Sequence, residues 1–253
     1  MKIDNRHLAK LTIQELFEKG DKYLIPIYQR NYEWGESHIK QLIDDIKDYF
    51  EQEHDKNYYI GTLIVDEREI NHTNYFETVD GQQRLTTLNI ICCALKAMNN
   101  IVCKNIFQSP NISFESRKLA DETLSFISQK GLKQPTFENF NENIFEGLKI
   151  AYKELDSIKK SMNENFDDFV HYFFTKVILI RVQVPEDTDL NHYFEIMNSR
   201  GEQLEKHEVL KSRLMKHLNM HPYPEDARKI FNHIWEACAD MNTYVQLLFD
   251  KEM

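Results

Sequence analysis

The sequence predicts an α+β protein in which a few β-strands are combined with a large helical part. The 253 residues include only seven glycines and six prolines, which favours long helices over many tight hairpins. Two segments, Tyr58–Val65 and Val177–Val184, are dense in apolar side chains, as expected for strands buried in a sheet. The length suffices for one large domain or two small ones.

The N-terminal part alternates between helix and strand signals. Thr12 and Glu15 have capping-box spacing, which predicts the start of a short helix. Pro26 disfavours helical angles in the preceding residue, and apolar side chains at every third or fourth position indicate helices further on. The expected elements are the helix to about Lys19, an extended segment at Tyr23–Ile27, a helix at Ser37–Glu51, strands at Tyr58–Val65 and Tyr75–Val79, and a helix at about Arg84–Val102.

The remainder of the chain is expected to be mainly helical. Residues 104–175 are rich in Asn, Glu, Lys, Ser and Phe and carry apolar side chains at helical spacing, which predicts a helical insertion. After the strand at 177–184, helices are expected at about 190–197, at 206–218 and from Pro224 onward. We therefore divide the chain into an α/β part at 1–103, the helical insertion at 104–175, and a returning strand with C-terminal helices at 176–253.

Charge and cysteine content exclude several classes of protein. The net charge of -10 would repel nucleic acid, so any DNA contact needs a local basic patch or another chain. The four cysteines contain no Cys-x-x-Cys pair, which argues against a zinc knuckle or a disulfide framework and favours buried, reduced thiols. The sequence starts without an apolar leader and has no stretch that could span a bilayer, so we expect a cytoplasmic protein without a membrane.

The polar turn Asp80-Gly81-Gln82-Gln83-Arg84 is the strongest candidate for a binding site. Gly81 permits a sharp turn, after which an apolar helix begins. The turn therefore delivers a carboxylate, two amides and a guanidinium to a helix N-terminus, where N–H groups and the helix dipole attract anions. Such a set suits a phosphate group, with or without a metal ion. The alternative is an ordinary Asp-Gly turn with capping side chains.

A second polar cluster spans Pro26–Trp34. If this segment is extended, Tyr28, Arg30 and Tyr32 share one side. Arg30 offers a planar fork for two phosphate oxygens, and the aromatic rings offer flat surfaces for a base. In the alternative interpretation the Tyr and Trp side chains pack under the following helix and Arg30 pairs with Glu33 or Glu36.

A third cluster, Asn198-Ser-Arg200-Gly201, follows an expected helix, and on its own it could be a helix C-cap and turn. The sequence has no P-loop, no Gly-x-Ser-x-Gly elbow and no His-Glu-x-x-His zinc helix. Its ten histidines show no metal-ligand spacing. Phosphate binding therefore stays beside capping and turn formation as an interpretation of the polar clusters.

Taken together, the clusters resemble the GmrS-type family, named for the S half of the GmrSD modification-dependent restriction enzymes. Four of its patterns occur in the expected order over roughly residues 24–214. They are Pro-x-Tyr-Gln-Arg-x-Tyr-x-Trp at Pro26–Trp34, Phe/Tyr-x-Gly at Tyr59–Gly61, Asp-Gly-Gln-Gln-Arg-Leu-Thr-Thr-Leu at Asp80–Leu88, and Phe-x-x-x-Asn-x-x-Gly-x-x-Leu at Phe194–Leu204. The second-to-last pattern is matched without a change and is highly specific, whereas the last would be weak alone.

The resemblance implies a fold similar to the ParB/sulfiredoxin-like domains, with a small mixed sheet and a nucleotide-phosphate loop entering a helix in the part at 1–103. It also implies binding and Mg²⁺-dependent hydrolysis of a nucleoside triphosphate that regulates restriction of foreign DNA in anti-phage defence. The implied catalytic residues are Asp80, which would hold Mg²⁺ or activate water, Gln82, Gln83 and Arg84. The implied nucleotide-binding residues are Tyr28, Gln29, Arg30, Trp34, Gly81, Asn198, Arg200 and Gly201.

One departure from the family limits what the chain is expected to do. Many members continue into a His-Asn-His-type nuclease, and the stretch after Pro224 shows no matching arrangement. We therefore expect no DNA cleavage by this chain alone, with DNA handled by a separate or missing nuclease domain, and a homo-oligomer is possible. The alternatives to hydrolysis are a nucleotide-sensing switch without turnover, a ParB-like DNA nickase and a structural scaffold.

Overall fold

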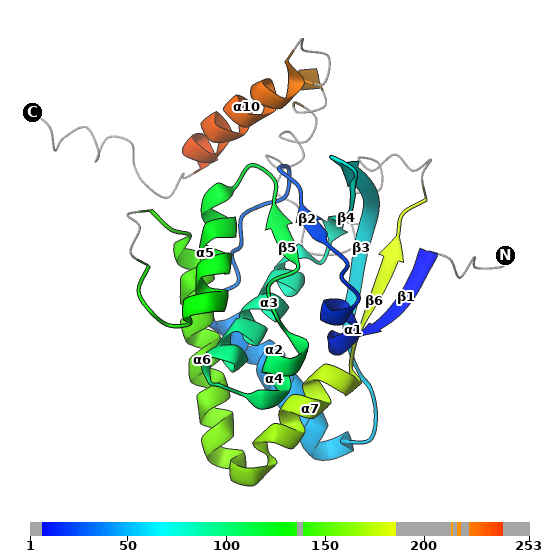
Figure 1. The fold of residues 1–253 in the computed structure, drawn as a ribbon, viewed down its shortest axis with the longest axis vertical. Helices are drawn as coiled ribbons and strands as arrows, with labels where there is room; N and C mark the ends of the chain where they lie inside the picture. Colours follow the sequence, from blue (N-terminus) through cyan, green and yellow to red (C-terminus); the bar gives the residue numbers. More distant parts are fainter. Residues whose placement is uncertain (1–6, 136–138, 186–213, 215–216, 219–222, 240–253) are drawn as a thin grey trace, which may run out of the picture. The chain divides into compact units, whose positions relative to one another are not determined.

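The computed structural model describes residues 7–135, 139–185, 214, 217–218 and 223–239 (Figure 1). The chain divides into two compact units. The first consists of residues 1–26 and 31–188, and the second of residues 27–30 and 189–253. The first unit contains the sheet, the core and the Asp80–Arg84 turn, and it is described first.

A six-stranded mixed sheet forms the frame of the first unit. In order of hydrogen bonding its strands are β1 (Leu8–Thr12), β6 (Val177–Gln183), β3 (Tyr58–Ile70), β4 (Thr73–Asp80), β2 (Tyr23–Ile25) and β5 (Ile112–Phe114). The pairs β1–β6 and β3–β4 are antiparallel, whereas β6–β3, β4–β2 and β2–β5 are parallel. The expected combination of a small mixed sheet with many helices is thereby confirmed.

Helices from the whole length of the first unit share one hydrophobic core with this sheet. They are α1 (Ile13–Glu18), α2 (Glu36–Glu53), α3 (Gln82–Ala97), α4 (Ile101–Ile106), α5 (Lys118–Lys130), α6 (Glu142–Met162), the short 3₁₀ helix at Asn163–Asn165, and α7 (Phe166–Lys176). Helix α6 contacts α2, α3 and α5, and Figure 1 shows these helices side by side along one side of the sheet. The core cluster draws side chains from all of them except the 3₁₀ helix.

Several expected elements are confirmed with small shifts in their ends. The capping box of α1 is present, because the Glu15 amide donates to Thr12 Oγ1 at 3.1 Å and the Thr12 amide donates to Glu15 Oε2 at 2.8 Å. Strands β3 and β4 are longer than expected and meet in a tight hairpin. Asn71 and His72, with φ of 50° and 61°, form its two-residue turn, in the left-handed region typical of such connections.

Other expectations were wrong. The predicted helix at 84–102 is two helices, because α3 ends at Ala97 and the Asn100 side chain caps α4 by accepting from the Cys103 amide at 3.0 Å. Strands β1 and β5 were missed, since each is short and is stabilised by pairing at an edge of the sheet. Because β5 belongs to the sheet, the segment 104–175 is not purely helical.

The described part of the second unit contains the helix α10 (Pro224–Ala239), on which the rings of Phe231 and Trp235 lie 5.4 Å apart. The helix expected at 190–197 and most of the one expected at 206–218 lie outside the described residues. Among the helices that the structure describes, none combines the length and the apolar character needed to cross a membrane.

Candidate functional site

Two irregularities of the sheet lie beside the Asp80–Arg84 turn. Where β3 pairs with β6, Tyr59 and Gly61 oppose consecutive residues, so Ile60 is an extra residue. Where β3 pairs with β4, Ile64 opposes Asp80 and Val65 opposes Thr78, so Val79 is a second extra residue. Bulges of this kind bend a strand and re-aim its side chains, and they are frequent next to active sites.

Gly81 forms the sharp connection between β4 and α3. Its φ of 91° lies in the left-handed region, and a Cβ atom at this position would come within 3.0 Å of the Thr62 carbonyl oxygen and 3.2 Å of Leu63 Cδ1. Because Gly81 is the N-cap residue and has no side chain, it cannot cap the helix. The first turn of α3 therefore presents main-chain N–H groups that no acceptor within the helix can satisfy.

Arg84 lies across β3 at the position where Gly61 leaves room for it. A Cβ atom added to Gly61 would come within 2.6 Å of Arg84 Nη1 and 2.8 Å of Cζ. The same Nη1 donates a hydrogen bond to the Thr62 carbonyl oxygen at 3.3 Å. Burial raises the pKa of the nearby Tyr58, and the positive charge of Arg84 partly opposes that rise. The guanidinium is thus held by β3, and Arg84 as a residue is half-buried.

Gln83 points away from the turn and binds the backbone of a distant segment. Its Nε2 donates to the Asn31 carbonyl oxygen at 2.8 Å, and its Oε1 accepts from the Glu33 amide at 3.0 Å. Gln83 is only 7% exposed. Both ends of the amide are therefore used to fix residues 31–33, and the expectation that Gln83 orients phosphate or water stays a prediction.

The Tyr32 side chain is buried in the interior of the first unit. Its ring is 2% exposed, and its hydroxyl lies 2.9 Å from Thr87 Oγ1 on α3. Burial raises its pKa, an effect that the bond to Thr87 only partly offsets. A ring in this position cannot stack on a nucleobase at the surface. The extended segment expected here is also interrupted, because the strand ends at Ile25 and residues 27–29 form a turn and bend.

The other predicted residues of the first unit differ in how far they reach solvent. Asp80 is exposed at the end of β4, whereas Gln82 is buried beside it with 5% exposure. Trp34 is half-buried against the core, and its indole stacks on the His38 ring with 5.6 Å between centroids and 13° between planes. Stacking on a base and packing on α2 thus remain compatible for Trp34.

Six predicted residues lie outside the described part of the first unit. Residues 27–30 belong to the second unit, with Tyr28 and Gln29 half-buried and Arg30 exposed. Asn198, Arg200 and Gly201 lie outside the described residues. The expectation that Arg30 and Arg84 hold one ligand from two segments therefore stays a prediction.

The residues gathered at the turn have a definite chemical character. An exposed carboxylate, a pinned guanidinium and a helix N-terminus stand within five consecutive residues, and all three suit a phosphate group or a phosphate-bound cation. In the described part of the chain, no group of three or more His, Cys, Asp or Glu side chains is arranged to hold a metal ion. A cation here would need most of its ligands from a bound phosphate and water.

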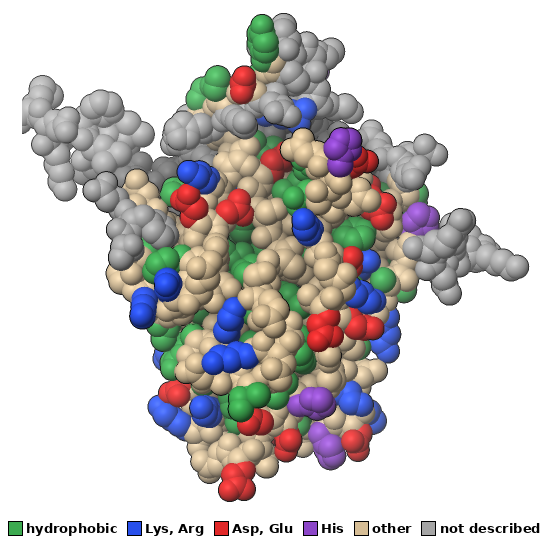
Figure 2. Space-filling view, viewed as in Figure 1, with side chains coloured by type: hydrophobic (Ala, Val, Ile, Leu, Met, Phe, Trp, Pro, Cys, Tyr) green, Lys and Arg blue, Asp and Glu red, His purple; other side chains and the backbone are tan. Residues whose placement is uncertain are grey.

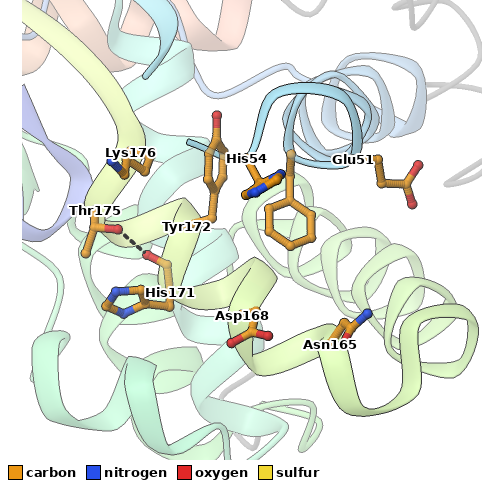
Figure 3. Close-up of a pocket in the computed structure, with 9 residues that line it drawn as sticks. Glu51, His54, Asn165, Asp168, His171, Tyr172, Thr175 and Lys176 are labelled. Atoms are coloured by element: carbon orange, nitrogen blue, oxygen red, sulfur yellow. Dashed lines mark hydrogen bonds between the residues drawn. The ribbon is translucent and has the colours of Figure 1, made fainter. Parts of the chain in front are cut away.

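A cavity of about 530 Å³ lies elsewhere, between the end of α2 and α7 (Figure 3). Figure 3 shows His54 and Glu51 on the α2 side and His171, Asp168 and Lys176 on the α7 side. At its rim the Tyr172 hydroxyl on α7 donates a hydrogen bond to the carbonyl oxygen of Lys56, which follows α2, at 3.0 Å. Among the predicted site residues that the structure describes, none lines it, and its charged groups are of both signs.

The described residues on the face drawn in Figure 2 do not add a second candidate. Figure 2 shows basic and acidic side chains interspersed over the described residues of one face, without a continuous basic area there. The sequence already identified the turn. It gave no signal for the contacts of Thr62 with Arg84 or of Thr87 with Tyr32, because these join residues far apart in the chain. The same holds for Asn143, whose Nδ2 donates to the Tyr32 carbonyl oxygen at 2.8 Å.

Comparison with known proteins adds one match. A family model described as the GmrSD restriction endonuclease, N-terminal domain, matches residues 13–215. That range includes β3, β4, the Asp80–Arg84 turn and all helices of the first unit. A search among curated proteins gave no match.

Proposed function

Since this chain belongs to the GmrSD restriction endonuclease family, as an N-terminal domain of that family, we propose that it binds a nucleoside triphosphate and hydrolyses it with Mg²⁺. In this proposal hydrolysis regulates a restriction system, and a separate nuclease acts on the DNA. The observation that carries the proposal is the position of Arg84, which Gly61 and the Thr62 carbonyl hold beside the N-terminus of α3.

The first support for this function is electrostatic. A triphosphate carries several negative charges, and the start of α3 offers main-chain N–H groups and the positive end of the helix dipole. Arg84 adds a permanent charge with a planar set of donors that matches phosphate oxygens. The bond to Thr62 leaves the other guanidinium N–H groups for such a ligand.

The second support is the fit of Asp80 to a magnesium ion. Mg²⁺ in phosphate-binding sites keeps several waters and uses one or two carboxylates together with the phosphates of the substrate. Asp80 is an exposed carboxylate directly before the helix that would bind the phosphates. When bound, the ion would neutralise phosphate charge and polarise the bond that breaks.

The chain's own residues would act mainly by positioning and charge neutralisation. In hydrolysis a water oxygen attacks the γ-phosphorus, the bond from that phosphorus to the bridging oxygen breaks, and a diphosphate, phosphate and a proton result. Arg84 and the α3 amides would stabilise the charge that moves onto the phosphate oxygens. Asp80 would hold the ion or accept the proton from water.

Phosphate release and ligand binding, measured together, test the proposal. The purified protein is given ATP, GTP, CTP or UTP with Mg²⁺, with and without DNA, and compared with Arg84→Ala. We expect release from at least one nucleotide, dependent on Mg²⁺, and a raised melting temperature that Arg84→Ala loses. A ligand at a hundred times its Kd stabilises the folded state by about 2.7 kcal/mol, which is easily measured.

Other outcomes would select other functions. Binding without turnover would indicate a nucleotide-sensing switch. Plasmid nicking that needs no nucleotide and is lost in Asp80→Ala would indicate a nickase. If no nucleotide binds or is hydrolysed under any of these conditions, the proposed function is wrong.

A further inference from the structure

We propose that Gln83 on α3 and Asn143 on α6 are positioning residues that lock the Asn31–Glu33 segment, and thereby the adjacent Trp34, for nucleotide binding. The inference deepens the proposed function and rests on it. It assigns a positioning role to a residue of α6, a helix that carries none of the family's motifs.

The backbone of this segment is bound by two side chains that lie far apart in the sequence, on α3 and α6. Gln83 Nε2 donates to the Asn31 carbonyl oxygen at 2.8 Å, and the Glu33 amide donates to Gln83 Oε1 at 3.0 Å. Asn143 Nδ2 donates to the Tyr32 carbonyl oxygen at 2.8 Å. Three consecutive residues thus have a main-chain group fixed by a side chain, in a stretch without helix or strand of its own.

Tyr32 anchors the same segment through its ring. The ring is 2% exposed, and its hydroxyl lies 2.9 Å from Thr87 Oγ1, which itself donates to the Gln83 carbonyl oxygen at 2.9 Å. On α6, one turn after Asn143, Gly147 leaves space for this ring: a Cβ atom there would lie 3.3 Å from Tyr32 Cε1. Helices α3 and α6 are therefore both shaped around one tyrosine.

The position of the lock explains why it matters for a ligand. Trp34, a predicted nucleotide contact, directly follows Glu33, so the locked residues fix the backbone from which its side chain extends. If the lock is lost, the segment becomes more variable before binding and must be ordered by the ligand. The conformational entropy that the segment then loses on binding weakens the affinity for the ligand, and it changes the catalytic step less.

Asn143→Asp is the most informative variant. Asn143 lies in the first turn of α6, where a carboxylate is favourable to the helix, so the helix itself should not be weakened. The carboxylate cannot donate to the Tyr32 carbonyl oxygen and would face it with a negative charge. Gln83→Glu is the second variant, since it keeps the acceptor for the Glu33 amide and loses the donor to Asn31. Glu146→Gln, which only breaks an exposed ion pair with Lys149 on α6, is the matched control.

Two measurements on the intact protein separate positioning from general stability. The first is hydrogen exchange of the Glu33 amide without nucleotide, for which we expect about fivefold faster exchange in both variants, in keeping with the loss of one hydrogen bond. The second is the steady-state kinetics of nucleotide hydrolysis. We expect KM to rise about fivefold in Asn143→Asp while kcat stays within about twofold, and Glu146→Gln to match the parent in both.

The outcomes distinguish this inference from the proposed function. Unchanged exchange at Glu33 in both variants would overturn the lock, and faster exchange with unchanged KM would overturn its part in nucleotide binding. A fall in kcat and melting temperature with constant KM would show a merely structural residue and also overturn it. If the parent protein binds no nucleotide, the proposed function fails by itself, and the exchange measurement still decides whether the lock exists.

Discussion

Gly61 and Arg84 occupy the same space: a Cβ atom on the glycine would lie 2.6 Å from one guanidinium nitrogen of the arginine. Gly61 has a φ of 125°, in a region that other residues rarely adopt, and it directly follows the bulged Ile60. The bulge, the glycine and the arginine are therefore structurally linked. The strand departs from regular pairing at the point where it accommodates the charged side chain. This relationship gives a physical reason for the Tyr-Ile-Gly segment that precedes the Asp80–Arg84 turn.

Gly61→Ala should weaken nucleotide binding through Arg84, although residue 61 itself offers no ligand group. The new Cβ atom must displace the guanidinium and also strains the backbone, at a cost of about 1–3 kcal/mol in stability. We expect at least a tenfold loss in kcat/KM, equivalent to about 1.4 kcal/mol in transition-state stabilisation. Phosphate-release kinetics and urea unfolding measure the two effects.

Gly20→Ala is the matched control for that variant. Gly20 also has a positive φ, 75°, but a Cβ atom there would meet nothing within 4 Å. It should therefore show the cost of the backbone conformation, about 1 kcal/mol, without loss of nucleotide binding. If Gly61→Ala binds nucleotide as well as Gly20→Ala does, the steric link between Gly61 and Arg84 has no functional meaning.

Arg84→Lys should behave almost like Arg84→Ala. Lysine keeps the charge, but its compact ammonium cannot lie flat over Gly61 and also present a planar fork to phosphate oxygens. We expect kcat/KM to fall by at least about tenfold, since one preorganised donor set is lost. Activity near that of the parent would mean that only the charge of Arg84 matters.

Arg68→Lys controls for the general effect of losing a guanidinium. Arg68 bridges Glu77 and Glu115 at 2.8 and 2.9 Å and so connects β3, β4 and the residue after β5. Loss of this bridge should lower the melting temperature and leave KM for nucleotide unchanged. Equal kinetic effects in the two variants would argue against a site at Arg84.

The sequence predicted the parts of this fold that depend on local chemistry. The capping box at Thr12 and Glu15, the glycine turn at Gly81 and the two central strands follow from neighbouring residues, and all are present. Strand β5 could not be predicted, because its three residues gain their pairing from β2, which lies almost ninety residues earlier in the chain.

The candidate site likewise contains residues that the sequence identified and residues whose roles depend on long-range contacts. Asp80 and Arg84 stand out as an exposed carboxylate and a guanidinium beside a helix start, and the structure places them there. The side chain of Gln83 could not be oriented from sequence, since its partners Asn31 and Glu33 lie about fifty positions away. Long-range contacts also decide that Tyr32 belongs to the core, which the sequence offered only as the alternative to stacking on a base.

Cys92, Cys93 and Cys103 should resist alkylation in the folded protein. All three are at most 1% exposed, and burial raises their pKa, for Cys103 to about 12. A rise of that size lowers the thiolate fraction about a thousandfold, in addition to the steric barrier. Iodoacetamide labelling followed by peptide mass analysis should leave them unmodified until guanidinium chloride unfolds the protein. Rapid labelling of the folded protein would contradict their burial.

Asp121 should make the protein less stable as the pH rises toward neutrality. Its side chain is half-buried in the first turn of α5 and accepts from the Phe114 amide at 2.8 Å. Burial raises its pKa to about 6, although the Phe114 amide opposes this rise, and Glu122 adds a smaller upward contribution. An unfolded aspartate has a pKa of about 3.9, so between about pH 4 and 6 the folded state binds more protons, and its stability falls as the pH increases.

Asp121→Asn tests this directly, because an amide oxygen can still accept from Phe114 while the charge is removed. At neutral pH the variant should be more stable than the parent by about 1 kcal/mol, a modest value because solvent screens a half-exposed carboxylate. The difference should shrink as the pH falls through about 6 and vanish near 4, where the parent side chain is protonated in both states. Urea unfolding of both proteins across this range measures it, with Glu122→Gln as the control for an exposed charge on the same helix. A variant less stable than the parent at neutral pH would mean that the dipole of α5 stabilises the carboxylate more than burial disfavours it, and the sign of the dependence would then reverse.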